Sequence, residues 1–71
     1  MRVTYDPESD AAYVYLAQTK LGEAVEQRFV EGGLILDFDK DGRLLGIEAL
    51  DATRQLRPEI LRDAVLPGTR P

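Results

Sequence analysis

The residues best suited to chemistry form the acidic stretch "DFDKDGRLLGIE" at positions 37–48. Asp37, Asp39, Asp41, Gly42 and Glu48 match the spacing of a calcium-binding EF-hand loop. Such a loop lies between two helices, whereas the preceding "EGGLIL" combines two glycines with residues that favour strands. The letters "DKDG" also fit a type I turn followed by a left-handed glycine. We therefore predict a β-turn, with weak calcium or cation binding by the three aspartates as the alternative.

The turn sets the register of its two flanking strands. It places Asp37 opposite Leu45 and Leu34 opposite Glu48, so that Glu48 and Asp37 lie on opposite faces of the sheet. In this register both faces of the hairpin are apolar, which is usual for a sheet covered on both sides. One short helix covers one face only, so we expect the other face to bind a second copy of the chain or another protein.

Glu48 and two tyrosines are the remaining candidate functional side chains. The register puts Glu48 on an apolar face, where a carboxylate needs a partner, and Arg54 or Arg57 is available. Tyr13 and Tyr15 lie on one side of their strand. They are either the aromatic anchors of an interface or half-buried core tyrosines with solvated hydroxyls.

Catalytic machinery is sparse in this composition. The chain has no histidine and no cysteine, which removes the commonest general base and the commonest nucleophile–base pairs. Its two lysines, Lys20 and Lys40, fall in predicted loops, and "EGG" lacks the lysine and helix of a phosphate-binding loop. We expect no enzymatic activity, and no catalytic, cofactor-binding or metal-ligating residue.

The net charge of −4 is unevenly distributed. Residues 1–52 carry five basic and eleven acidic side chains, whereas residues 53–71 carry four basic and two acidic ones. An acidic body repels a phosphate backbone, so nucleic-acid binding is expected only through the arginine-bearing C-terminal segment. We expect that segment to fold back onto the oppositely charged body instead. Its arginines are Arg54, Arg57, Arg62 and Arg70.

Length and patterning predict one small α+β domain. Its 71 residues give a marginal core that self-association would reinforce. No apolar run approaches the ~20 residues of a membrane span, and "MRVTYDPESD" lacks the apolar core of a secretory signal, so we expect a cytoplasmic protein. We predict strands at 2–5, 11–17, 23–30, 34–38 and 43–50, a helical turn within 51–57, and a helix from Pro58 through Val65 that Pro67 and Gly68 end.

Short connections between these elements favour an antiparallel β-meander of five strands, with the C-terminal helix packed on the sheet. The domain is expected to span residues 1–66, and residues 67–71 to form a flexible tail.

Two stretches, "VTYDPESDAAYVYL" and "GLILDFDKDGRLLGIEALDA", resemble the bacterial proteins of domain-of-unknown-function family 2283. The resemblance implies a small α+β domain with an antiparallel sheet and assigns no catalytic residue. Members encoded beside small toxin-like proteins imply an antitoxin-like role with a small basic partner. Our leading expectation is thus a homodimeric protein-interaction module. The matching residues are Tyr5, Asp6, Glu8, Asp10, Ala11, Tyr13, Gly46, Ile47, Glu48, Asp51 and Ala52.

Overall fold

The computed structural model describes residues 2–18 and 22–68, and these form a five-stranded antiparallel sheet followed by two short helices. The predicted α+β class is confirmed, but the expected single helix is two. The elements are β1 (Arg2–Asp6), β2 (Ala11–Tyr15), β3 (Glu26–Val30), β4 (Leu34–Phe38), β5 (Leu44–Leu50), α1 (Ala52–Gln55) and α2 (Pro58–Arg62).

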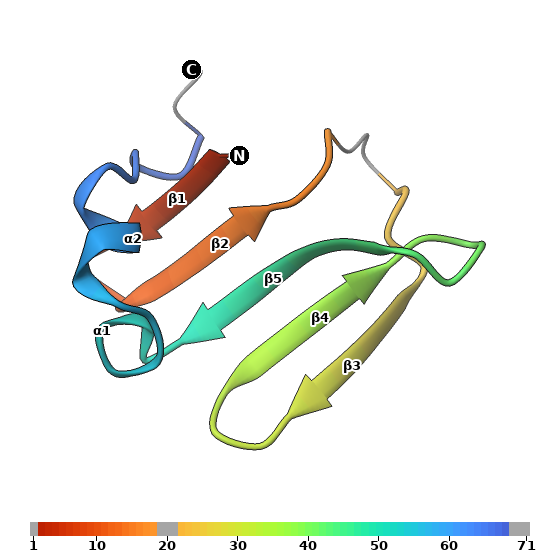
Figure 1. Cartoon of the computed structure of the whole chain (residues 1–71), viewed down its shortest axis with the longest axis horizontal. Helices are drawn as coiled ribbons and strands as arrows, with labels where there is room; N and C mark the ends of the chain where they lie inside the picture. Colours follow the sequence, from red (N-terminus) through yellow and green to blue (C-terminus); the bar gives the residue numbers. More distant parts are fainter. Residues whose placement is uncertain (1, 19–21, 69–71) are drawn as a thin grey trace.

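The strand order is β1-β2-β5-β4-β3, so the predicted meander is wrong (Figure 1). The chain passes from β2 to the far edge of the sheet and returns, which places β5 in the centre. Burial explains this order. Leu45 and Ala49 of β5 are buried, which requires neighbours on both sides, whereas every residue of β3 is exposed, as suits an edge strand.

The aspartate-rich turn forms as predicted, between strands and not between helices. Asp39 accepts a hydrogen bond from the backbone of Gly42 (3.0 Å) and donates one to the carbonyl of Arg43 (2.9 Å). Gly42 has a φ of 80°, the left-handed conformation that glycine adopts without steric cost. The turn therefore joins β4 to β5 as an antiparallel hairpin.

A β-bulge changes the predicted register of that hairpin. Phe38 pairs with Leu44 as expected, but Asp37 pairs with Gly46 and not with Leu45. Leu45 is thus the additional residue of a bulge, and every later pair shifts by one position. Glu48 consequently lies opposite Ile35 and not opposite Leu34. The prediction failed because Leu44 and Leu45 are equally apolar, so the hydrophobic pattern did not reveal the extra residue.

The shift separates the two faces of the sheet chemically. On the helix face, Ala12 of β2 and Ala49 of β5 form the core with Ala52 of α1. The opposite face, which we call the open face, mixes polar, aromatic and aliphatic side chains, so it is not the apolar second face that the sequence predicted. Partly buried residues around the core are Tyr5, Leu34, Leu56 and Leu61. From the pairing of the strands, the open face carries Arg2, Thr4, Tyr13, Tyr15, Gln27, Phe29, Ile35, Asp37, Glu48 and Leu50.

The segment after α2 lies along the outer edge of β1. Val65 donates a backbone hydrogen bond to Val3 (3.0 Å) and accepts one from Tyr5 (2.8 Å). The predicted helix through Val65 is therefore too long, because this residue leaves the helix to pair with a strand. The described part of the C-terminal segment contacts the body, as expected. Lys20, Arg70 and the end of the predicted tail lie outside the described residues.

Candidate functional site

A network of side-chain hydrogen bonds crosses the open face from β2 to β3. The hydroxyl of Tyr13 donates to Oδ2 of Asp37 on β4 (2.6 Å). The side-chain amide of Gln27 on β3 donates to Oδ1 of the same carboxylate (2.9 Å). Asp37 is only 8% exposed, so both of its oxygens need partners, and the two hydrogen bonds supply them.

Gly46 lets Tyr13 reach across the central strand. β5 lies between β2 and β4, so the tyrosine ring passes over it to meet Asp37. A Cβ at Gly46 would lie 2.6 Å from both Cε1 and the hydroxyl of Tyr13, closer than real Cβ contacts come. Glycine inside a strand commonly marks such a close approach, and here the approaching group is an aromatic side chain.

The surroundings of Tyr13 keep its hydroxyl protonated. Burial raises the pKa of Tyr13, and the hydrogen bond to Asp37 together with the negative charge of that carboxylate raises the pKa further. Tyrosine is neutral when protonated, so at neutral pH this hydroxyl is a hydrogen-bond donor and not a base. The Tyr13–Asp37 pair therefore suits recognition and structural support.

Aromatic and cation–π contacts extend this hydrogen-bond network toward β1. The rings of Tyr13 and Tyr15 lie 4.6 Å apart between centroids, with their planes tilted by 54°. The guanidinium carbon of Arg2 lies 4.2 Å from the centroid of the Tyr15 ring, within the range of a cation–π interaction. Side chains from four of the five strands thus form a continuous series on the open face.

A groove of about 280 Å³ lies beside the two tyrosines. Asp6 and Glu48 are the acidic residues of its lining, which also includes Pro67. The expected partners of Glu48 are elsewhere: Arg54 contacts Gly32 and Asp51, and Arg57 contacts Glu59. Within residues 2–18 and 22–68, Glu48 has neither a hydrogen bond nor an ion pair. The complete lining is Thr4, Asp6, Ser9, Ala11, Ala12, Tyr13, Tyr15, Glu48 and Pro67.

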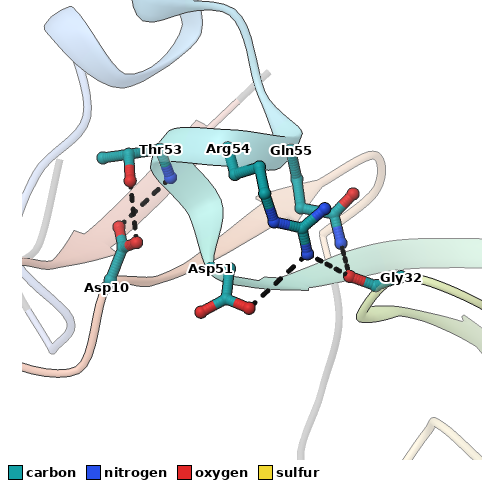
Figure 2. Close-up of polar contacts among 6 residues, drawn as sticks. All are labelled: Asp10, Gly32, Asp51, Thr53, Arg54 and Gln55. Carbon is teal, nitrogen blue, oxygen red and sulfur yellow. Dashed lines mark hydrogen bonds and ion pairs between the residues drawn. The ribbon is translucent and has the colours of Figure 1, made fainter.

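Asp10 joins the turn after β1 to the start of α1, as Figure 2 shows in part. Its carboxylate accepts hydrogen bonds from the backbone N–H (3.1 Å) and the hydroxyl (2.8 Å) of Thr53. The hydroxyl of Tyr5 donates a third (2.8 Å). These bonds, that of the Thr53 side chain foremost, lower the pKa of Asp10. Asp10 therefore takes the capping role that the side chain of Asp51, next to the helix, does not perform.

The other end of α1 is joined to the β3–β4 turn. Arg54 donates a hydrogen bond to the carbonyl of Gly32 (2.7 Å), and the side-chain amide of Gln55 donates to the same carbonyl (Figure 2). Arg54 also forms an ion pair with Asp51 (3.5 Å). These contacts link α1 to the half of the sheet that carries Asp37 and Gln27, so they support the geometry of the open face.

The structure separates the aspartates of the EF-hand-like spacing. Asp37 accepts a hydrogen bond from Tyr13 on the open face. Oδ1 of Asp39 instead accepts backbone hydrogen bonds from Asp41 and Arg43, each 2.9 Å long. Among the described residues there is no group of three or more acidic side chains placed to hold a metal ion. The same part of the chain has no helix long and apolar enough to cross a membrane.

Sequence reasoning identified Tyr13, Tyr15 and Glu48 but missed the residues that connect them. Asp37 was placed at the end of the predicted strand 34–38 and considered only as a weak cation ligand, Gly46 was noted only in the family resemblance, and Gln27 was not singled out. The available signal was Gly46, because a glycine within a predicted strand indicates either a bulge or a close approach. The close approach occurs at Gly46 and the bulge at the preceding residue, Leu45.

Comparison with known proteins places this sheet in a family. No curated protein and no solved structure matches the chain. A family model described as "Protein of unknown function (DUF2283)" matches residues 2–52, from the start of β1 to the first residue of α1. The matched range includes Tyr13, Asp37, Gly46 and Glu48, and it excludes Pro67. The chain therefore belongs to the DUF2283 family of proteins of unknown function.

Proposed function

We propose that this protein is a cytoplasmic protein-interaction module that binds a cationic segment of a partner protein in the groove of the open face. The groove is the observation that carries this proposal. It combines two tyrosine rings with two carboxylates on a sheet face that the helices leave uncovered. A small basic toxin-like protein is one partner with this chemistry.

The chemistry of the groove favours a lysine or arginine side chain. Tyrosine rings attract cations to their faces, and the neighbouring stack of Arg2 on Tyr15 is an example within the same sheet. Glu48 supplies a half-buried carboxylate with which an incoming cation would pair. The excess of acidic side chains in residues 1–52 would also speed the encounter with a basic partner.

Catalysis has less support than recognition. The chain contains no histidine or cysteine, and the raised pKa of Tyr13 leaves its hydroxyl protonated at neutral pH. Binding of nucleic acid also has less support, because Arg54 and Arg57 already contact Asp51 and Glu59. The sheet and its groove have the features of a recognition surface.

Titration of the purified chain with a lysine- and arginine-rich peptide tests the proposal. Calorimetry at low salt should show binding that Glu48→Gln weakens by about tenfold, which corresponds to about 1.4 kcal/mol. Glu59→Gln is the matched control: it removes the same charge from α2 and should change the dissociation constant less than twofold. Equal weakening by both variants, or no binding by the wild-type chain, would contradict the proposal.

A further inference from the structure

The outer edge of β3 is the uncovered edge of the sheet. Val65 pairs with β1 at the opposite edge, whereas no segment within 2–18 and 22–68 pairs with the outer side of β3. All five residues of the strand are exposed, and Phe29 is 75% exposed, with the preceding Val25 at 62%. An open edge with exposed apolar side chains is a ready template for another strand.

The backbone N–H and C=O groups of β3 point alternately toward β4 and toward the free edge of the sheet. The carbonyl of Val30 accepts a hydrogen bond from Gly33 inside the β3–β4 turn (3.2 Å), so it points toward β4. In an antiparallel sheet, alternate residues direct their N–H and C=O groups to opposite sides of the strand. The N–H and C=O groups of Gln27 and Phe29 therefore point outward, toward the free edge.

We propose that a second copy of this chain pairs with that edge, β3 antiparallel to β3, about a two-fold axis at Gln27. In this register Glu26 faces Arg28 of the second copy, and Arg28 faces its Glu26. Phe29, which is 75% exposed, lies on the opposite side of the sheet beside these ion pairs. Two ion pairs between the copies thus form from side chains that are exposed in the single chain.

The charges of β3 favour this register over registers in which the axis lies one residue away. An axis at Arg28 would place two arginines opposite each other, and an axis at Glu26 would place two glutamates opposite each other, both of which destabilise a strand pair. Arg28 already lies over the Phe38 ring (4.5 Å) and contacts Glu26 (2.8 Å), which holds the two charges on the helix face. Beyond the complementary segment, Glu23 would face Glu31, so the pairing ends there.

This pairing goes beyond the proposed cation-binding groove and does not depend on it. A two-fold axis perpendicular to the sheet keeps the open faces of both copies on the same side. The pair would therefore present two grooves on one surface, and a partner with two basic segments would gain avidity. The homodimer expected from two apolar sheet faces thus depends instead on a strand edge.

Charge exchange tests the pairing and its register. At tens of micromolar, sedimentation should give the wild-type chain twice its mass of 7.9 kDa. Glu26→Arg alone and Arg28→Glu alone create like-charge pairs, and each should weaken self-association by about 100-fold. An equimolar mixture of the two variants should restore the pair, because every facing charge is then complementary.

Lys40→Glu is the matched control, since it makes the same charge change as Arg28→Glu at an exposed turn residue, and it should leave self-association unchanged. Circular dichroism of each variant checks that the sheet is intact. A monomeric wild-type chain, or a mixture that stays monomeric, would overturn the pairing. Peptide binding by the monomeric variants tests the groove separately, so the two proposals fail independently.

Discussion

Substitution of Gly46 by alanine tests whether the open face depends on the passage of Tyr13 over β5. The alanine methyl group would lie 2.6 Å from the tyrosine hydroxyl and 2.8 Å from Cζ. These atoms belong to the end of a side chain that rotates, so the ring should swing away and the backbone should stay in place. Asp37 would then lose its 2.6 Å hydrogen bond and keep only the one from Gln27.

The expected cost follows from that lost contact. A hydrogen bond to a buried charged group contributes about 1.5–3 kcal/mol. Alanine in place of glycine inside a strand returns about 0.5–1 kcal/mol of backbone entropy. We therefore expect Gly46→Ala to lower the free energy of unfolding by about 1–2 kcal/mol, with a fall in melting temperature of about 4–8 °C for each kcal/mol.

A double-mutant cycle separates this mechanism from a general effect of the substitution. In a Tyr13→Ala background the ring is absent, and Gly46→Ala should become neutral or stabilise the protein by about 0.5–1 kcal/mol. A Tyr15→Ala background is the control, because the atoms nearest to the added Cβ all belong to Tyr13, so the cost should persist. Urea denaturation measures all the variants. The same cost in the wild-type and Tyr13→Ala backgrounds would refute the mechanism.

Four further predictions concern pH and the aspartate turn. Hydrogen bonds from Thr53 and Tyr5 lower the pKa of Asp10 from 3.8. The stability that this carboxylate contributes is therefore present above that pH and is lost as the pH falls below it. Asp10→Asn should reduce the difference between the urea denaturation curves at neutral and acidic pH. Tyr13 has its pKa raised from 10.0, so the folded state holds the proton longer; stability should fall as the pH rises above 10, and Tyr13→Phe should reduce that fall in thermal melts. Asp39→Ala removes two hydrogen bonds to the backbone of the turn and should cost about 1 kcal/mol. Millimolar calcium should leave the wild-type melting temperature unchanged, and a clear rise would instead support cation binding by the aspartates.

Local signals in the sequence predicted the elements well. The four residues of "DKDG" contain both the aspartate that accepts the turn hydrogen bonds and the glycine that takes the left-handed conformation, so the hairpin was predictable. The five strands followed from apolar alternation and from turn residues between them. The helical turn within 51–57 and the start of α2 at Pro58 were also predicted correctly.

Non-local features were not predictable in the same way. The bulge at Leu45 depends on which of two adjacent leucines packs into the core, and the hydrophobic pattern is the same for either choice. The central position of β5 depends on burial summed over the whole sheet. The Tyr13–Asp37 contact joins residues 24 positions apart on strands that are not neighbours, so it follows only after both the strand order and the bulge are known.

The backbone bonds of Val65 to Val3 and Tyr5 affect how far assembly can proceed. A sheet that is bare at both margins can add copies without limit and grow into a fibre. Here the β1 edge of the sheet is already paired with the Val65 segment. Two copies that pair through β3 would therefore each use the edge to which further copies would otherwise add. If two copies pair through β3 as proposed, loosening the Val65 segment should allow further copies to add and turn the pair into a polymer.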